Sequence, residues 1–292
     1  MSHSLGATAE GHRLPAATRV GSVRLQVGDL GRSIAWYERV LGMAVLTRGA
    51  DRATLGTAAG TPLVHLIERL GASPVQRRSH LGLFHFAILL PDRTALGRFL
   101  RHLASIDEPV GASDHLVSEA LYLHDRDGLG IEVYADRPRS TWTRQDGELT
   151  IRTLPLDLED VLAAGGDTPW TGLPEGTVMG HMHLHVGDLE QAAAFYRDGL
   201  GFDATVWSYP GALFLSAGGY HHHLGLNIWA GPDARPAGEN DARLLEWELI
   251  LPDPESLART ATRLEAAGHA VARSADGHRL SDPWEIPLLL RT

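Results

Sequence analysis

The chain contains no cysteine, which excludes disulfides, thiolate metal sites and a cysteine nucleophile. It also lacks an apolar run of about 18 residues, the length that a membrane-spanning helix requires. No basic stretch offsets the formal net charge of −10, so neither nucleic acid nor an anionic membrane is an expected partner. Met1 to Thr18 has no apolar segment typical of a signal peptide. These absences predict a soluble cytoplasmic protein.

Length and composition predict a globular protein with room for two domains. Hydrophobic residues make up 43% of the chain and charged residues 21%, as in folded domains. A chain of 292 residues can form two domains of ordinary size, each with its own core. The oligomeric state stays open at this stage, with a homo-oligomer as one option.

Histidine, in contrast, is abundant and unevenly distributed. His181, His183 and His185 alternate with apolar residues, so a β-strand would place the three imidazoles on one face. A second dense group lies in the apolar segment 221–229, which we expect to form another strand. Any one of these rings could be a hydrogen-bonded core histidine. Six of them on two short strands favour a metal centre with the groups that surround it.

An internal repeat organises the chain. Asp29 and Asp188, Tyr37 and Tyr196, and Gly42 and Gly201 are each separated by 159 positions. Each copy predicts a strand, a turn at Gly-Asp, and a helix of about ten residues that ends at a glycine. A weaker copy of the same pattern follows within each half, where Pro-Asp precedes a predicted helix. Repeats at fixed spacing indicate similar structural units, and here they predict four modules in two pairs.

The module boundaries predict the following division of the chain: a flexible N-terminal arm over residues 1–19, a first domain over 20–137, a linker over 138–177 and a second domain over 178–292. The linker is rich in polar, Gly and Pro residues, and it includes a predicted short helix near Leu156–Ala163. Because each of the four modules combines one helix with several strands, the predicted fold class is α+β.

The repeated motifs resemble those of a known superfamily. Val-Gly-Asp-Leu, an aromatic residue followed by Tyr, and Leu-Gly occur in this order in both halves. Together with one helix and three strands after the first strand, they resemble the vicinal oxygen chelate superfamily of glyoxalases, bleomycin-resistance proteins and extradiol dioxygenases. The segments 82–91, 118–122, 130–132, 180–186 and 220–227 are most similar to its branch of bacterial two-domain catechol-2,3-dioxygenases. The resemblance implies four βαβββ modules that form half-open barrels.

The resemblance also implies where metal ligands stand. They come from the first strand of a module, at Ser22, His85, His181 or Glu246, and from its last strand, at Glu132 or Leu289. Neither half of the chain holds a complete two-histidine, one-carboxylate set, but modules two and three together supply one. We therefore predict a metal site of His85, Glu132 and His181, where module two faces module three. Modules one and four would then face each other as a metal-free scaffold.

Three further residues match catalytic positions of the resembling enzymes. The resemblance implies that His222 is the acid/base, that Tyr122 donates a hydrogen bond to the substrate, and that His115 supplies a proton late in the cycle. In a regular strand the neighbours of His222 would point to the opposite face. His183 and His185 are expected to line the pocket or to support the ligands. Without the resemblance, Glu132 could be a solvated strand carboxylate, and His85 and Tyr122 could be ordinary core residues.

Two histidines and a carboxylate form the facial triad of non-haem iron oxygenases, which leaves coordination positions open for substrate and O2. The function predicted from the resemblance is therefore an extradiol ring-cleaving dioxygenase that uses iron(II), or manganese(II), on catechol or a substituted catechol. Two alternatives stay open: another metal-dependent glyoxalase-like enzyme, such as an isomerase or transferase, and a non-catalytic protein that binds an aromatic drug. The choice of metal and the ring substituents are not determined by the sequence.

Overall fold

A computed structural model describes residues 5, 6, 11–75 and 80–292, and it has the predicted α+β fold. Its elements form four modules of the order βαβββ. The first contains β1 (Arg19–Val27), α2 (Leu30–Trp36) continued by η1 (Tyr37–Leu41), β2 (Ala44–Arg48), β3 (Arg52–Gly56) and β4 (Pro62–Glu68). The second contains β5 (His80–Leu89), α3 (Arg93–Ser105), β6 (Gly111–Asp114), β7 (Ser118–His124) and β8 (Gly130–Asp136).

The second half repeats this order. The third module contains β11 (Val178–His185), α5 (Leu189–Ala192) continued by η3 (Ala193–Leu200), β12 (Asp203–Val206), β13 (Ala212–Ser216) and β14 (Leu224–Asn227). The fourth contains β16 (Arg243–Ile250), α6 (Pro254–Ala266), β17 (Ala272–Ser274), β18 (Gly277–Ser281) and β19 (Pro287–Arg291). Between the halves lie η2 (Arg139–Thr141), β9 (Arg144–Gln145), β10 (Glu148–Leu149) and α4 (Leu158–Gly165), and β15 (Arg235–Pro236) precedes the last module.

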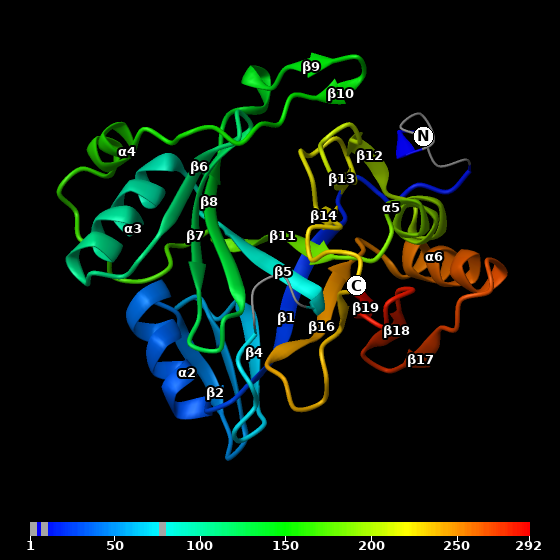
Figure 1. Ribbon diagram of the computed structural model, residues 1–292, viewed down its shortest axis with the longest axis horizontal. Coiled ribbons are helices and arrows are strands. Elements are labelled where there is room, and N and C mark those ends of the chain that lie inside the picture. Colours follow the sequence, from blue (N-terminus) through cyan, green and yellow to red (C-terminus); the bar gives the residue numbers. More distant parts are fainter. Residues whose placement is uncertain (1–4, 7–10, 76–79) are drawn as a thin grey trace.

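The modules combine across the two halves of the chain. In the described part of the structure, one sheet has nine strands: eight follow the order β12-β13-β14-β11-β5-β8-β7-β6, which joins modules three and two, and β15 pairs with β5 outside this order. The other has eight strands in the order β17-β18-β19-β16-β1-β4-β3-β2, which joins modules four and one. The antiparallel pairs β5–β11 and β1–β16 form the two junctions. Figure 1 shows these four strands at the centre of the molecule, with the helices around them. The predicted pairing of modules is confirmed.

An aspartate starts each of the five α-helices in these modules and in the linker. The side chains of Asp29, Asp92, Asp157, Asp188 and Asp253 each accept a hydrogen bond from the backbone N–H three residues later. Such a cap satisfies one of the free donors of the first turn and contributes about 1 kcal/mol. The repeated Gly-Asp and Pro-Asp motifs therefore have a local structural cause.

A tyrosine in each half ties the first helix to the turn before the last strand. The Tyr37 hydroxyl donates to Asp125 Oδ2 at 3.1 Å, and the Tyr196 hydroxyl donates to Asp282 Oδ2 at 2.9 Å. The second oxygen of each aspartate accepts two backbone N–H groups of its own turn. These ties join module one to module two and module three to module four. The helices end at Gly42 and Gly201, whose φ values of 69° and 99° suit glycine.

The linker and the N-terminal arm pack against the modules. Helix α4 lies against α3 so closely that a Cβ on Gly97 would stand 2.2 Å from the backbone oxygen of Val161. In the arm, Leu5 and Leu14 are buried, and the Leu14 N–H donates to the Gly201 oxygen at 2.8 Å. The described part of the arm is therefore docked rather than loose, while residues 1–4 and 7–10 of the predicted arm lie outside the described residues. The exact domain boundaries stay a prediction.

One predicted strand is shorter than expected. Strand β14 spans Leu224–Asn227, whereas the sequence predicts a strand over residues 221–229. His221, His222 and His223 lie in the turn before it, where their backbone does not alternate as in a strand.

Among the described residues, no helix is long and apolar enough to cross a membrane.

The buried aspartates predict a pH-dependent stability. Burial raises the pKa of Asp125 from 3.8 to about 7, in spite of the backbone N–H groups that favour its charged form. Between these two pH values the folded chain holds a proton that the unfolded chain has released, so the free energy of unfolding falls as pH rises. This contribution is complete below about pH 4 and lost above about pH 7. This difference between the pKa values of the folded and unfolded chain corresponds to at most roughly 4 kcal/mol in the free energy of unfolding.

Asp125→Asn should therefore weaken the pH dependence of the unfolding free energy between pH 4 and 7, as measured by urea unfolding of chelator-treated protein. Asp282→Asn is the matched variant in the second half: burial raises the pKa of Asp282 to about 6, so its effect should be complete at a lower pH. If unfolding curves of Asp125→Asn and the unmodified protein shift in parallel across this range, the assignment is wrong.

Candidate metal centre

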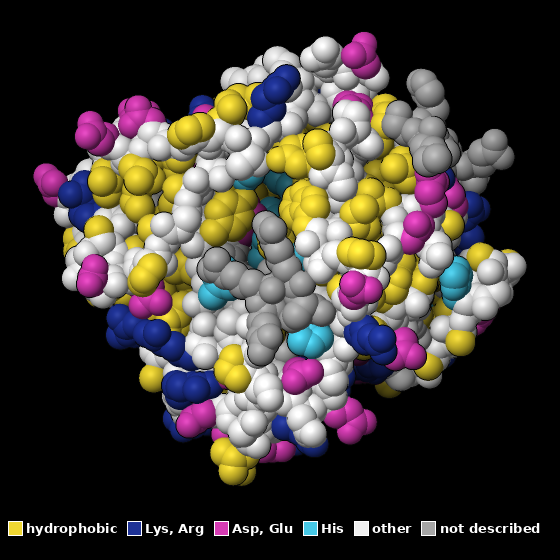
Figure 2. All heavy atoms as spheres, viewed as in Figure 1, with side chains coloured by type: hydrophobic (Ala, Val, Ile, Leu, Met, Phe, Trp, Pro, Cys, Tyr) yellow, Lys and Arg dark blue, Asp and Glu magenta, His cyan; other side chains and the backbone are white. Residues whose placement is uncertain are grey.

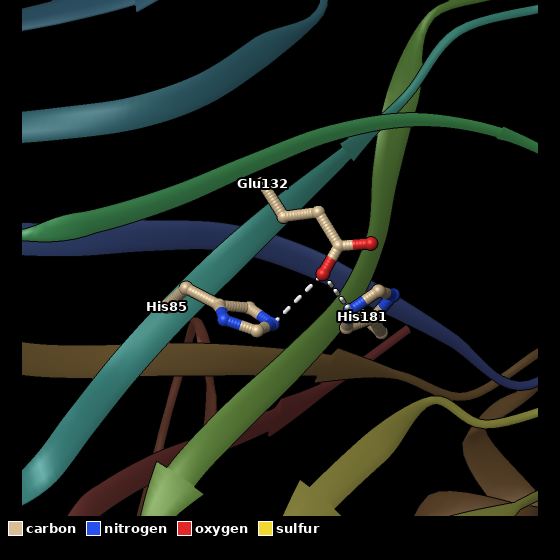
Figure 3. A group of neighbouring side chains, drawn as sticks. All are labelled: His85, Glu132 and His181. Carbon is tan, nitrogen blue, oxygen red and sulfur yellow. Dashed lines mark hydrogen bonds and ion pairs between the residues drawn. The ribbon is translucent and has the colours of Figure 1, made fainter. Parts of the chain in front are cut away.

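Three strands of the nine-stranded sheet position His85, Glu132 and His181. Glu132 on β8 and His181 on β11 both stand opposite Ala87 of β5, one on each side of it. Residues paired in this way project from the same face of a sheet. His85 lies two residues before Ala87 on β5, so its side chain projects from that face too. The register therefore brings the three side chains together, as Figure 3 shows.

The three side chains converge on one point. Glu132 Oε2 lies 3.0 Å from His85 Nε2 and 3.3 Å from His181 Nε2. The three potential ligand atoms lie within 4.8 Å of one another, and each residue is at most 5% exposed. Among the described residues, this is the only group of three or more such side chains close enough to share a metal ion.

The hydrogen bonding of the group fits a metal ion. His85 Nε2 is buried and makes no hydrogen bond, although Glu132 is near, and His181 Nδ1 is also buried without a hydrogen-bond partner. A buried ring nitrogen normally has a partner, so its absence at His85 points to a missing ligand. His181 Nε2 donates to Glu132, and a cation bound between them would replace that proton. Two imidazoles and one carboxylate suit iron(II) or manganese(II).

Burial sets the ionisation of the group. It lowers the pKa of both His85 and His181, so their rings are neutral near neutral pH, the form that binds a metal. Burial opposes ionisation of Glu132 as well, but His181 and His85 beside it hold the pKa of this carboxyl well below its ordinary value. One negative charge with two neutral donors is the state ready for a divalent cation.

A cavity of about 260 Å³ opens beside these residues, and its wall is mainly apolar. It is lined by Phe84, His85, Ser113, His115, Val117, Tyr122, Glu132, Ile151, Thr153, His183, Tyr209, Phe214, His222 and Trp229. The list includes all three residues predicted to be catalytic. Figure 2 shows histidines inside a hollow bordered by hydrophobic side chains. The cavity is large enough for a small aromatic molecule.

Tyr122 and His115 form a pair on one side of the cavity. His115 Nδ1 lies 2.7 Å from the Arg152 backbone oxygen and must donate to it, which leaves Nε2 of the neutral ring as an acceptor. The Tyr122 hydroxyl donates to this Nε2 at 2.6 Å. Burial and the nearby Glu132 raise the pKa of Tyr122 well above its ordinary value, so the phenol keeps its proton.

His222 lies on another side, against a proposed ligand. Its ring centroid is 4.2 Å from that of His181, and its Nδ1 lies 2.7 Å from Nδ1 of His221. The expectation that His221 points away from His222 is therefore wrong, because these residues lie in a turn and not in a strand. His223 does point elsewhere, since its Nδ1 accepts a hydrogen bond from the Ala217 N–H.

His183 and His185 line cavities, as expected. The His183 ring faces His85 at a centroid distance of 4.9 Å, and a Cβ on Gly225 would stand 2.9 Å from this ring. Gly225 therefore makes room for it. His185 lines an adjoining cavity of about 420 Å³, and its Nδ1 lies 2.6 Å from Asn227 Oδ1. Phe84 forms part of the wall of both cavities.

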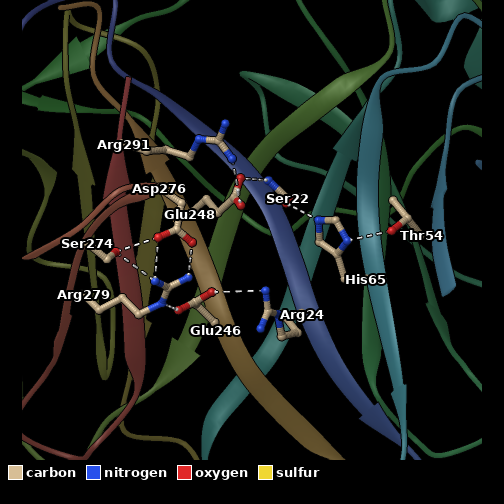
Figure 4. A network of polar contacts seen from close by, with 10 residues as sticks. All are labelled: Ser22, Arg24, Thr54, His65, Glu246, Glu248, Ser274, Asp276, Arg279 and Arg291. Carbon is tan, nitrogen blue, oxygen red and sulfur yellow. Dashed lines mark hydrogen bonds and ion pairs between the residues drawn. The ribbon is translucent and has the colours of Figure 1, made fainter. Parts of the chain in front are cut away.

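The corresponding positions of the other sheet hold no such group. Glu246 pairs with Arg279 at 2.7 Å and with Arg24 at 3.8 Å, as Figure 4 shows. Ser22 Oγ is bonded to His65 Nε2 at 3.0 Å, and Leu289 supplies no ligand atom. At the positions equivalent to the candidate metal centre, protein groups thus form ion pairs and hydrogen bonds with one another. This supports the prediction that modules one and four form a scaffold.

Part of the cavity wall was not predicted from the sequence. Ile151 and Thr153 come from the linker, and the Thr153 hydroxyl lies 2.9 Å from that of Tyr209 across the wall. Tyr209 and Trp229 lie in connections beside β13 and β14. Apolar and aromatic residues in loops show no regular spacing, so the sequence offers no signal that would place them in the pocket.

The family model of the glyoxalase/bleomycin resistance protein/dioxygenase superfamily matches residues 19–133 and 178–282. The chain belongs to this superfamily. A relative from Bacillus subtilis (strain 168), named catechol-2,3-dioxygenase, is 46% identical over 269 residues, which cover 91% of this chain and 94% of the relative.

Solved structures show the same fold at lower identity. A protein from Bacillus subtilis subsp. subtilis, provisionally assigned as a dioxygenase, has a TM-score of 0.64 at 15% identity, over 96% of this chain and 86% of its own. Glyoxalase I from Zea mays has a TM-score of 0.56 at 18% identity, over 94% of this chain and 92% of its own. Within the superfamily, the fold is thus shared by proteins with different names, so the reaction must be argued from the site.

Metal retention tests the ligand set. His85→Ala and His181→Ala should each lower metal affinity by more than roughly 100-fold, because each removes one of three donors. Glu246→Ala is the matched control: Glu246 has the same position in module four but is paired with arginines. The metal-to-protein ratio of anaerobically purified variants provides the measurement. Loss of metal in Glu246→Ala alone would place the site in the other sheet.

Proposed function

We propose that the protein is an extradiol ring-cleaving dioxygenase that acts on catechol or a substituted catechol. His85, Glu132 and His181 are the proposed metal ligands, and iron(II), or manganese(II), is the proposed ion. The observation that carries the proposal is the convergence of these three side chains, of which His85 and Glu132 line the same cavity as His222 and Tyr122. The 46% identical relative named catechol-2,3-dioxygenase supports it.

The donor set limits the chemistry. When bound, such an ion would supply open coordination positions at which a vicinal diol and O2 can react. The three protein groups would all hold it from the same sheet, because the strands that carry them are neighbours. The apolar wall, including Phe214 and Trp229, would position the aromatic ring and exclude bulk water.

His222 and Tyr122 would handle protons. Burial lowers the pKa of His222 well below its ordinary value, so the ring is neutral and able to accept a proton from a catechol hydroxyl. Tyr122 would donate its hydroxyl hydrogen to a substrate oxygen, which would compete for it with His115 Nε2. His115 would then be free to exchange a proton later in the cycle.

The reaction itself provides the first test. Anaerobically purified protein loaded with iron(II), given catechol and then O2, should form a yellow ring-opened product. Ring cleavage of this type puts both oxygen atoms into the product, so one O2 should be consumed per catechol without an added reductant. An oxygen electrode and the absorbance of the product measure the two quantities. If iron-loaded protein cleaves none of several catechols but still binds them, the protein is a binding module.

Substitutions at the proton-handling residues provide the second test. His222→Gln should lower kcat about 10²–10⁴-fold, the range for loss of a general base, and should leave the metal content unchanged. Tyr122→Phe removes one hydrogen bond and should lower kcat roughly tenfold. His65→Gln alters a histidine of the other sheet and should keep kcat within about twofold. Equal losses in His65→Gln and His222→Gln would contradict the assigned roles.

A further inference from the structure

A chain of hydrogen bonds leads away from Nδ1 of His222, a residue that lines the cavity. His222 Nδ1 lies 2.7 Å from His221 Nδ1, and His221 Nε2 lies 2.9 Å from Asp136 Oδ1. His221 is fully buried, whereas the Asp136 side chain is 28% exposed. No step of the proposed function uses His221 or Asp136. Both ring nitrogens of His221 thus have hydrogen-bond partners, and these partners limit which nitrogen can donate and which can accept.

The partners determine which atoms carry hydrogens. An ionised carboxylate can only accept, so His221 Nε2 must be the donor toward Asp136. In a neutral His221 ring, Nδ1 is then an acceptor. Its partner, His222 Nδ1, must therefore carry a hydrogen and donate it. The neutral His222 ring is left with a bare Nε2, the nitrogen not engaged by His221, and His222 lines the cavity.

Two tyrosines hold Asp136 in place as the end of this chain. The Tyr220 hydroxyl donates to Asp136 Oδ1 at 3.1 Å, and the Tyr134 hydroxyl lies 2.7 Å from that of Tyr220. Because the Tyr220 hydrogen is given to the carboxylate, Tyr134 donates to Tyr220. Asp136 ends β8 and lies four residues after Glu132, so the strand that carries a proposed ligand also carries the acceptor.

We propose that Asp136 and His221 are positioning residues that fix the tautomer of His222. They hold its hydrogen on Nδ1 and keep the lone pair of Nε2 free to take a proton from the substrate. The consequence for catalysis rests on the proposed function, whereas the tautomer itself is a property of the chain alone. An aspartate that orients a catalytic histidine acts in the same way in serine proteases, where the wrong tautomer costs about 10⁴-fold in kcat.

The tautomer is measured directly by two-bond ¹H–¹⁵N correlation spectra of the full-length, chelator-treated chain labelled at histidine. His222 is identified by the signal that His222→Gln lacks. The expected result is a hydrogen on Nδ1 of His222 and on Nε2 of His221. A hydrogen on Nε2 of His222 in the unmodified chain overturns the proposal, whether or not the protein cleaves catechol.

Variants then test the chain of hydrogen bonds. Asp136→Ala and His221→Ala remove the acceptor or the connecting ring, and should reduce the Nδ1–H form of His222 and lower kcat about 10–100-fold, with KM and metal content close to unchanged. His221→Gln offers an amide oxygen to His222 and an amide N–H to Asp136, so it should restore much of both. His223→Gln is the control, because it alters the same turn at a residue bonded to Ala217 and should leave kcat within about twofold.

The outcomes separate this proposal from the proposed function. If iron-loaded protein cleaves no catechol but the tautomers are as expected and shift in Asp136→Ala, the positioning holds and the reaction is wrong. If catechol is cleaved and Asp136→Ala changes neither the His222 tautomer nor kcat, the positioning is wrong and the reaction stands. A loss of kcat in His223→Gln equal to that in His221→Ala would show a disturbed turn, and this also overturns the proposal.

Discussion

The antiparallel pairing of β5 with β11 is the constraint on which the rest of the structure depends. It joins module two to module three, and its register sets Ala87 opposite His181 while β8 sets Glu132 on the other side of Ala87. Because side chains alternate along a strand, a slip of one residue would turn His181 away from Glu132. The proposed metal centre is therefore a product of register between segments that lie about a hundred residues apart in the sequence.

The two sheets carry different side chains at equivalent positions. In one, a carboxylate and two imidazoles are buried with nitrogen atoms that lack hydrogen-bond partners. In the other, Glu246 forms ion pairs with arginines and Ser22 is hydrogen-bonded to His65. A buried charge without a partner is costly, so an ion-free position must either lose its charge or pair it. The same strand arrangement thus carries an ion-paired carboxylate in the eight-stranded sheet and imidazoles with unbonded nitrogens in the nine-stranded sheet.

Polar side chains around the cavity form chains of hydrogen bonds, and each chain has a defined direction. Tyr122 donates to His115, and Asp136 accepts from His221, so the direction of each hydrogen bond follows from a carbonyl or carboxylate at its end. Such ends are informative, since these oxygens only accept. Tyr122, His115 and His222 line the cavity together with Tyr209 and Trp229, and low local polarity there strengthens hydrogen bonds.

The sequence by itself determined the four-module plan, because Asp caps, Gly helix ends and alternating apolar residues are local signals. The proposed ligand set also came from the sequence, through the resemblance of motifs and the absence of ligands at Ser22 and Leu289. Only the tertiary structure placed Asp136 beside His221 and brought the linker to the cavity, since neither contact leaves a periodic trace in the chain. It also corrected segment 221–229, where apolar composition favoured a strand. His221 is instead bonded to His222 and Asp136, and His223 accepts from the Ala217 N–H, in the turn before β14. Local patterns determine elements, whereas hydrogen-bond partners distant in sequence are decided by packing.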